Sequence, residues 1–498
     1  VEKGGGVESF AIRQESDGRA SLRPHRIGVG GFDAIDGKLT RTFSVELDID
    51  GELTEVPELA GVKRPAILLV NDEDLAYAKI RLDEKSLGAA VERLDAFEDR
   101  LARTSVLFAA WDMCRDGLMS ATDYTRIVLK ALPDETDGTV LRYILNQLIT
   151  AVTVYSAPAG REALHDAVAA RVFDILSEAG FDTDKIEGIG HRVVQGGWYF
   201  PESKVVTEKT LGWVREVAPL APLHNYAEAD VIEICREMFP SIGNVIVADT
   251  SFHYNIPEKA WRYALPRDVV DRLHIRKYGA HGTSHRYIWK KTAEFLGGDV
   301  HKLVSCHLGS GASLSAIEDG RDKETTMGLT PLDGLIMGTR CGTIDPATVA
   351  YLMREGGYSI DEVDTMMNKQ SGLLALSGLS SDSRDIEEAA EGGDANCQLA
   401  LEMFYYRTSQ LIAEMAQSMH GFDTMVFTAG IGENSSTMRL GVAKELEWLG
   451  VRIDEEANKV RSGEPRVIST EDSAVKLLVV PTNEELMIAL DVEELLSK

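Results

Sequence analysis

Residues 302–319 read KLVSCHLGSGASLSAIED, two apolar runs on either side of a short segment of small residues. The pattern predicts a strand, a tight turn and a second strand, in which Gly309 and Gly311 allow backbone angles that a side chain would forbid. Bare N–H groups at such a turn can hold a phosphate, although the lysine of a Walker loop is absent. The stretch therefore predicts a phosphate-binding hairpin.

Further buried-strand runs that end in glycine, aspartate or asparagine occur on both sides of this hairpin. They alternate with helical patterns such as CQLALEMFYYRTSQLIAEMAQSMHG (397–421). This alternation predicts an α/β region from about residue 180, with its polar residues gathered at strand ends, where open α/β sheets place their ligands. The runs are KIEGIGHRVV (185–194), GNVIVADTSF (243–252), MVFTAGIG (425–432) and KLLVVPTN (476–483).

The first third of the chain has a different pattern. Residues 22–82 alternate strand-like runs with turns, and the pairs Asp36-Gly37 and Asp50-Gly51 indicate hairpins, so we expect a small β-sandwich. From about residue 84 the apolar spacing becomes helical, with Ser120 placed as an N-cap. The expected helical segments are 86–111, 120–132 and 139–155.

Composition limits the classes of function. The 498 residues are 44% hydrophobic and 27% charged, as in a soluble globular protein, and the formal net charge is −28. A strongly acidic chain argues against a nucleic-acid or anionic-membrane binder. The five scattered cysteines form no CxxC pair, and no apolar run approaches the roughly 20 residues of a membrane span, so we expect a cytoplasmic protein.

Nine short segments beyond residue 180 carry a resemblance to a known family. They are GHRVVQGG (190–197), APLHN (221–225), ADTSFH (248–253), RKYGAHGTSHRY (276–287), HLGSGAS (307–313), TMGLTPLDGLIMGTRCGTIDP (326–346), SGLSSDSRD (377–385), FTAGIGEN (427–434) and PTNEEL (481–486). In order and spacing they resemble the acetate kinases, of the acetate and sugar kinase, Hsp70 and actin superfamily. The resemblance implies an actin-like ATPase (ribonuclease H-like) fold, ATP and acetate as substrates, Mg²⁺ (or Mn²⁺) as cofactor, and a homodimer.

The reaction implied is phosphoryl transfer from ATP to a small carboxylate, which needs cations and fixed donors more than a nucleophile. Arg192 and Arg340 suit this chemistry, because a guanidinium can clamp a carboxylate or a phosphate; a surface ion pair is the alternative for either. The resemblance assigns the carboxylate to Arg192 and makes His281 a donor to the phosphoryl group. His281 and His285 have a zinc-compatible spacing, but no HExxH glutamate accompanies them, and we expect His285 to pack or cap.

The resemblance also assigns the metal and nucleotide sites. Asp249, at the end of a buried strand, belongs to the site through the magnesium shell or an arginine, and Glu484 corresponds to the magnesium-linked glutamate. For His224 and for His307, a structural role is at least as consistent with the sequence as a functional role. The substrate pocket maps to Arg192, Val194, Leu223 and Pro331. The nucleotide loops are His307, Leu308, Gly309, Ser310 and Gly311; Asp382, Ser383 and Arg384; and Gly430, Ile431, Gly432, Glu433 and Asn434, the last group lying between a strand and a helix that starts near Ser435.

Three positions depart from the acetate kinase pattern. Ser310 replaces an asparagine, Ala280 a phenylalanine and Gln195 a histidine. A serine can still hydrogen-bond a phosphate with a shorter reach. Loss of a ring at Ala280 opens room in the acid pocket, so we hypothesise a shift towards propionate or butyrate.

The front of the chain resembles a different family. Residues 22–59 and 68–87 are similar to the non-catalytic C-terminal region of actinobacterial aminopeptidase N, of the M1 family. No HExxH or GAMEN-type motif is present, so aminopeptidase activity is the weakest reading. Residues 1–180 also lack the N-x-G-S-S-S phosphate loop with which acetate kinases open, so the kinase region has a truncated first domain.

We therefore expect a join between residues 160 and 185, which a gene fusion, an assembly error or a deliberate chimera would each produce. The leading interpretation is an acetate kinase; the alternative is a catalytically impaired chimera that at most binds nucleotide. The expected domains are a β-sandwich (1–83), a helical segment (84–178), the remnant of the first kinase domain (179–249 with 484–498) and the nucleotide-binding domain (250–483).

Overall fold

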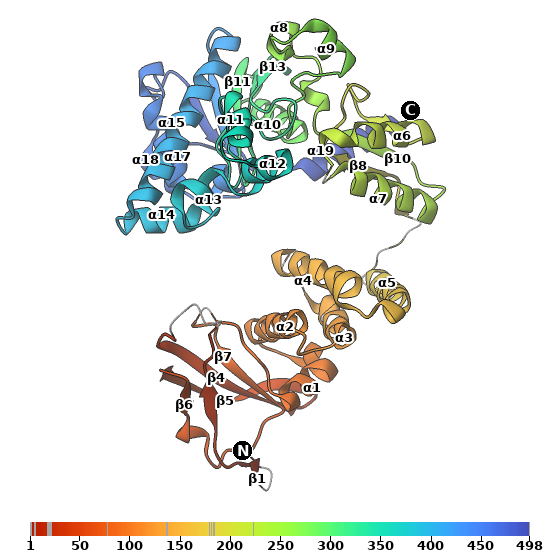
Figure 1. Ribbon diagram of the computed structural model, residues 1–498, viewed down its shortest axis with the longest axis vertical. Helices are drawn as coiled ribbons and strands as arrows, with labels where there is room; N and C mark the ends of the chain where they lie inside the picture. The colour runs from red at the N-terminus through yellow and green to blue at the C-terminus, as the bar shows by residue number, and fades with distance from the viewer. Residues whose placement is uncertain are drawn as a thin grey trace. The chain divides into compact units, whose positions relative to one another are not determined.

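The computed structural model describes residues 2–3, 6–16, 22–76, 78–135, 138–178, 180, 182, 185–222 and 224–497. The chain divides into two compact units, Val1–Lys185 and Ile186–Lys498, which run from red to gold and from yellow-green to blue in Figure 1. Each hydrophobic cluster of the described residues lies within one unit. The finer domain boundaries expected from the sequence remain a prediction.

The first unit contains the expected sandwich, with one sheet in the order β5-β4-β7 and another that pairs β3 with β6. Ile12, Val29 and Leu68 are among the side chains packed between the sheets. The Asp36-Gly37 hairpin is confirmed, and both residues have positive φ. The Asp50-Gly51 hairpin is wrong, because the strand after this turn pairs in the other sheet. The strands are β1 (Glu2–Lys3), β2 (Gly6–Val7), β3 (Ala11–Arg13), β4 (His25–Ile35), β5 (Lys38–Ile49), β6 (Leu53–Glu55) and β7 (Ile67–Asp72).

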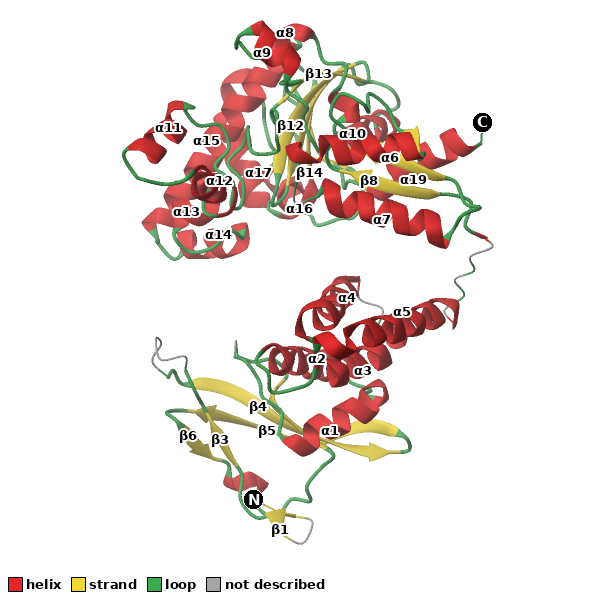
Figure 2. Cartoon of the chain, turned by 45° about the vertical axis from the view of Figure 1, so that its right-hand side comes forward, coloured by secondary structure: helices red, strands yellow, loops and turns green. Residues whose placement is uncertain are grey.

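Helices follow the sandwich and pack on the β4–β7 sheet through a second cluster that includes Phe32 and Leu69 (Figure 2). Side-chain caps fix several helix starts. The Ser120 hydroxyl accepts a hydrogen bond from the N–H of Asp123, so the predicted N-cap is confirmed. The helices are α1 (Glu84–Arg93), α2 (Arg100–Arg115), α3 (Ala121–Ala131), α4 (Gly138–Thr150) and α5 (Arg161–Glu178).

The second unit begins with a small sheet in the order β8-β10-β9, in which β8 and β10 are parallel. Strand alternation gives this sheet two buried faces. Ile246 and Ala248 face α6 and α7, whereas Val245 and Val247 face α19, from the far end of the chain. The elements are β8 (Ile189–Val193), β9 (Lys204–Val205), α6 (Glu208–Val217), α7 (Asn225–Met238), β10 (Asn244–Ala248) and α19 (Glu484–Leu496).

The large sheet has the order β13-β12-β11-β14-β16-β15, with β11, β14 and β16 parallel. One face packs against α10 through residues such as Ile288 and Val426, and the other packs against α15 and α17 through Phe404 and Phe427. The predicted α/β architecture is confirmed. The strands are β11 (Lys302–Leu308), β12 (Ala312–Glu318), β13 (Arg321–Thr325), β14 (Thr424–Thr428), β15 (Arg466–Val467) and β16 (Lys476–Val479).

Eleven further helices of the second unit lie around the large sheet and its connections. No helix in the described part of the chain combines the length and apolar character needed to cross a membrane. The helices are α8 (Glu258–Trp261), α9 (Arg267–Arg272), α10 (Gly282–Phe295), α11 (Ala347–Arg354), α12 (Ile360–Lys369), α13 (Gly372–Ser377), α14 (Ser383–Glu391), α15 (Ala395–Ser418), α16 (Ala429–Asn434), α17 (Ser436–Glu445) and α18 (Glu455–Lys459).

The predicted hairpin over 302–319 is confirmed: β11 and β12 are antiparallel, and Leu308 lies opposite Ala312. The reason given for its glycines is wrong, because neither Gly309 nor Gly311 has the left-handed backbone that favours glycine. A Cβ at Gly311 would lie 3.4 Å from Nη2 of Arg340, an ordinary van der Waals distance. The guanidinium of Arg340 therefore lies directly beside the turn.

Candidate active site

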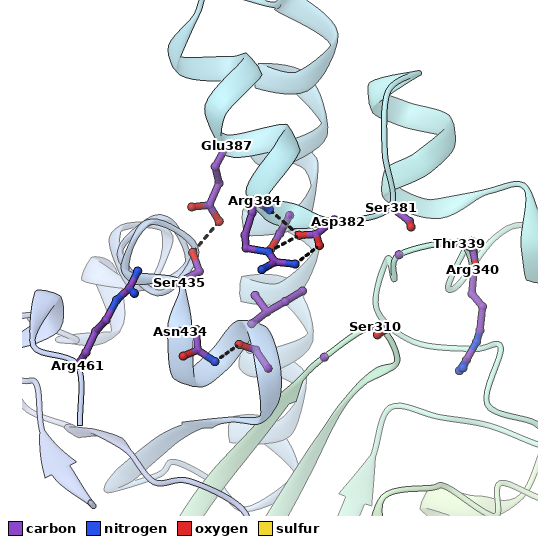
Figure 3. A pocket seen from close by; sticks show the side chains of 15 residues that line it. Ser310, Thr339, Arg340, Ser381, Asp382, Arg384, Glu387, Asn434, Ser435 and Arg461 are labelled. Atoms are coloured by element: carbon purple, nitrogen blue, oxygen red, sulfur yellow. Dashed lines mark hydrogen bonds and ion pairs between the residues drawn. The ribbon is translucent and has the colours of Figure 1, made fainter. Parts of the chain in front are cut away.

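A cavity of about 680 Å³ opens beside the β11–β12 turn (Figure 3). It lies where β11 and β14 end, which is the edge at which α/β sheets gather ligands. Its walls come from five separate stretches of sequence, so tertiary folding makes the site. The lining residues are Gly309, Ser310, Gly338, Thr339, Arg340, Ser381, Asp382, Ser383, Arg384, Glu387, Gly430, Ile431, Asn434, Ser435 and Arg461.

Eight of the thirteen residues predicted to bind nucleotide line this cavity: Gly309, Ser310, Asp382, Ser383, Arg384, Gly430, Ile431 and Asn434. The other five, His307, Leu308, Gly311, Gly432 and Glu433, do not line it. Glu433 links two backbone segments next to the site, because its Oε1 accepts hydrogen bonds from the N–H groups of Ala429 and Thr482 at 2.8 and 3.1 Å. The expected loop at 430–434 is instead the short helix α16, which begins directly after β14.

Sequence reasoning missed six lining residues: Gly338, Thr339, Ser381, Glu387, Ser435 and Arg461. Gly338, Thr339, Ser381 and Ser435 adjoin predicted site residues, and that adjacency was the available signal. The sequence carries no signal for Glu387 and Arg461, because a charged side chain in a helical or polar segment is ordinarily exposed to solvent. The Ser435 hydroxyl donates to Glu387 at 2.7 Å, which joins the start of α17 to α14.

Two arginines at this site differ in how their charge is compensated. Arg384 donates from Nε and Nη2 to the carboxylate of Asp382 at 3.0 and 2.6 Å. Arg340 is half-buried and donates from Nη1 to the carbonyl of Pro331 at 2.9 Å. No carboxylate in the described part of the chain pairs with Arg340, and burial lowers its pKa. Arg340 is therefore a half-buried cation whose charge no carboxylate of the described residues compensates.

The β11–β12 turn offers donors next to that cation. The Gly309 N–H donates to the carbonyl of Gly311 at 3.1 Å. Among the described residues, the N–H groups of Ser310 and Gly311 have no acceptor. Two free N–H groups beside an uncompensated guanidinium form a cradle for a phosphate.

Arg192 and Asp249 form a two-point ion pair at the ends of β8 and β10. Arg192 donates from Nε and Nη2 to Asp249 at 3.1 and 2.5 Å. Burial raises the pKa of Asp249, and the Arg192 guanidinium opposes that rise. Nη1 of Arg192 makes no hydrogen bond with a described residue. The pair therefore fixes the direction of the guanidinium and leaves one of its nitrogens for a ligand.

Glu484, the first residue of α19, lies close enough to this pair for Asp249 and Arg192 to affect its ionisation. Burial first, and then the charge of Asp249, raises the pKa of Glu484 to about 7. Its Oε1 is buried and has no hydrogen-bond partner. A buried carboxylate oxygen without a partner is unfavourable unless a cation or donor binds it.

His281 directly precedes α10, in the left-handed conformation with φ 57°. The ring stacks on His307 at 4.1 Å between centroids. Burial first, and then His307, lowers the pKa of His281 well below that of a free imidazole. A Cβ on Gly311 would lie 3.5 Å from Nε2 of His281, so that nitrogen and Arg340 approach the same point. Gly282 allows this packing, because a Cβ there would lie 2.2 Å from the carbonyl oxygen of Asp249.

The structure describes all but one of the residues predicted to form the acid pocket. Val194 is buried, Pro331 is half-buried against Arg340, and Ala280 is buried in the main core. Leu223 lies outside the described residues. His224 stands at the start of α7, and burial first, and then Arg192 and Arg340, lower its pKa.

The fold and this site together define a phosphotransferase with the actin-like ATPase fold. The family model for the acetokinase family matches residues 134–490, and the model for the ERAP1-like C-terminal domain matches residues 67–195. The chain belongs to the acetokinase family.

The individual relatives agree with this assignment. "Acetate kinase 2" of Clostridium perfringens is 50% identical over 317 residues, which is 63% of this chain and 79% of the relative. An acetate kinase of Thermotoga petrophila is 49% identical over 321 residues, 64% of this chain and 80% of the relative. The crystal structure of a Francisella tularensis propionate kinase has a TM-score of 0.63 and 40% identity, covering 66% of this chain and 84% of that structure.

Proposed function

We propose that this chain transfers the γ-phosphoryl group of ATP, reversibly and with Mg²⁺, to acetate or a slightly longer short-chain carboxylate. The product is an acyl phosphate, formed by direct in-line transfer. The observation that carries the proposal is Arg340, which is half-buried, has no carboxylate partner among the described residues and faces the Gly311 turn. Charge that develops on a transferring phosphoryl group needs such fixed donors.

Each polar group near the turn then has a task. Arg192 holds the substrate carboxylate through Nη1, while Asp249 fixes the orientation of its guanidinium. Arg340 and Nε2 of His281 donate to the equatorial oxygens of the phosphoryl group. The transition state is loose and spreads its charge over three oxygens, so positioned donors lower the barrier without a covalent intermediate.

Glu484 is the residue that fits Mg²⁺, with Asp249 in the surroundings. Its buried Oε1 lacks a partner, as a ligand oxygen without its metal would. The described residues hold no group of three or more acidic, histidine or cysteine side chains that could bind a metal alone. Mg²⁺ needs only one or two carboxylates, with water and phosphate oxygens as its other ligands. Bound there, it would neutralise charge on the phosphate oxygens.

The test is formation of acetyl phosphate from ATP and acetate by the purified chain, trapped as the hydroxamate. We expect turnover that falls about a thousandfold in Arg340→Ala, since one transition-state donor is worth about 10²–10³ in kcat. Arg407→Ala is the control, because Arg407 lies on α15 and its side chain bonds only Gln410 among the described residues. Full activity of Arg340→Ala would overturn the proposed role.

A specific observation favours a second candidate, a chain that binds nucleotide without turnover. In the described part of the chain, no strand pairs with the outer edge of β8, the strand that carries Arg192. An unpaired edge leaves backbone groups exposed and favours association of chains. The N-x-G-S-S-S segment is also absent from residues 1–180. Calorimetric binding of ADP with Mg²⁺, combined with no hydroxamate product, would favour this candidate.

The expected homodimer is also part of this proposal, and it is supported by the family resemblance alone. Light scattering on the purified chain distinguishes a mass of twice 54.6 kDa from the monomer.

A further inference from the structure

Four histidines gather behind the β11–β12 turn: His253, His281, His285 and His307. The proposed function uses only one of their nitrogens, Nε2 of His281. His285 is fully buried and does not reach the cavity. Both ring nitrogens of His285 are hydrogen-bonded. A histidine held in this way can orient a neighbouring group.

His285 lies in the middle of a continuous hydrogen-bonded chain. Its Nδ1 is 2.8 Å from Oγ of Ser305 on β11, and its Nε2 is 2.8 Å from Oγ of Ser313 on β12. Oγ of Ser313 is in turn 2.9 Å from Nδ1 of His281. The order of the chain is Ser305, His285, Ser313, His281. The first three side chains are completely buried, so only the His281 end meets the site.

The protons of this chain can be counted. A neutral imidazole carries one N–H and a serine one O–H, so four groups supply four protons for three hydrogen bonds. Burial lowers the pKa of both histidines well below the usual value, which keeps them neutral. Three arrangements fill all three bonds, because a serine oxygen can accept two hydrogen bonds, and each leaves one proton over.

The three arrangements differ in where that last proton lies. If the donors run from Ser305 towards His281, the spare proton is on Nε2 of His281, which faces the turn. If they run the other way, the spare proton is on the Ser305 hydroxyl, and if both histidines donate to Ser313, it is on the Ser313 hydroxyl. Among the described residues, neither hydroxyl has a partner outside this chain that could accept the spare proton. A buried hydroxyl proton without an acceptor is unfavourable, which favours the first arrangement.

We infer that Ser305, His285 and Ser313 are positioning residues that hold His281 as the Nε2–H tautomer, with its N–H aimed at the transferring phosphoryl group. The inference rests on the proposed function for the identity of what His281 faces. In the opposite tautomer, Nε2 would present a lone pair to the phosphoryl oxygens and repel them. The buried hydrogen-bonded chain thus selects one of the two neutral tautomers of His281, the one that donates from Nε2.

His253 protects the neutrality of this chain. Its Nδ1 is 2.5 Å from the Asp322 carboxylate, and its Nε2 is 2.9 Å from the carbonyl of Ala280. The ring lies 5.6 Å from that of His285, and burial first, and then His253, lowers the pKa of His285.

The direct test is the tautomer of His281 in the intact chain. Long-range ¹H–¹⁵N spectra of the ¹⁵N-histidine protein at pH 7.5, assigned with His281→Gln and His285→Gln, distinguish Nδ1–H, Nε2–H and imidazolium. We expect Nε2–H for both His281 and His285. An Nδ1–H tautomer or an imidazolium at His281 would overturn the inference. This readout needs no turnover, so it stands even if the hydroxamate assay disproves the kinase activity.

Variants give a second test. In Ser313→Ala we expect the tautomer of His281 to become mixed and kcat to fall about tenfold to a hundredfold, with KM for ATP changed less than threefold. Ser305→Thr, which keeps the hydroxyl, should retain the wild-type tautomer, and Ser305→Ala should not. Ser409→Ala is the control, since it removes a buried hydroxyl whose one acceptor in the described part of the chain is the carbonyl of Tyr406. An unchanged tautomer and kcat in a folded Ser313→Ala protein would also overturn the inference.

Discussion

At the scale of single residues, Arg192 and Arg340 have different electrostatic roles in the proposed function. Asp249 already compensates most of the charge of Arg192, so Arg192 is best suited to hold and orient a substrate that is bound from the start. No carboxylate of the described residues compensates Arg340, so its field is available for charge that appears during the reaction. Interactions that strengthen in the transition state are those that raise kcat.

Ala280 is the residue at which we expect substrate choice to be set. It is 3% exposed and packs in the main core, and we expect a ring here to reduce the room in the proposed acid pocket. We expect Ala280→Phe to lower the ratio of kcat/KM for propionate to that for acetate by about tenfold, the value of one methylene group. Ala280→Val, a smaller change in a buried position, should lower the ratio less. A ratio that stays equal or rises in Ala280→Phe would contradict the hypothesis.

Glu484 predicts a pH dependence of stability in metal-free protein. Its pKa is about 7 in the folded chain, above the ordinary value of 4.5, so folding favours the protonated form. The unfolded chain therefore binds fewer protons between these values, and the contribution of Glu484 to stability is lost as pH rises through 7.

We accordingly expect Glu484→Gln to raise Tm by about 2 °C at pH 8 and to leave it nearly unchanged at pH 4.5. Glu485→Gln is the matched control, because Glu485 is adjacent and exposed. Thermal unfolding followed by calorimetry at both pH values checks this. An equal shift at both values would mean that Glu484 does not titrate near 7.

At the scale of elements, the hairpin, the parallel strands and the long helices follow from local patterns. Apolar runs that end in glycine, aspartate or asparagine predict β11, β12, β14 and β16. The turn at Asp50-Gly51 is present, but the hairpin predicted across it is wrong, because a turn signal does not specify which strand the chain joins next. Arg461 and Glu387 reach the cavity only through the packing of α14 and the segment after α18, which no local pattern encodes.

The start of α10 is an element whose geometry depends on one glycine. We expect Gly282→Ala to lower Tm and to abolish activity, because its Cβ would lie 2.2 Å from a backbone oxygen of Asp249. Gly212→Ala is the contrasting control. Gly212 lies exposed within α6 with nothing within 4 Å, so alanine there should stabilise the helix by about 0.5–1 kcal/mol. Similar Tm changes in the two variants would show that Asp249 can move aside.

At the scale of the whole molecule, the two units have separate hydrophobic clusters, and only the second contains the candidate site. We therefore expect calorimetry of the intact chain to resolve two thermal transitions. ADP with Mg²⁺ at a hundred times its Kd should stabilise only one of them, by about 2.7 kcal/mol. A single transition that shifts as a whole with nucleotide would show that the units unfold together.

The position of α19 has a consequence for synthesis on the ribosome. The small sheet formed by residues 189–248 receives one of its two covering layers from α19. That sheet stays uncovered on one face during translation of more than two hundred intervening residues, and it can be completed only after residues 484–496 emerge. A product that stops before residue 484 loses both this covering helix and Glu484, so prematurely ended chains should be rapidly degraded rather than partly active.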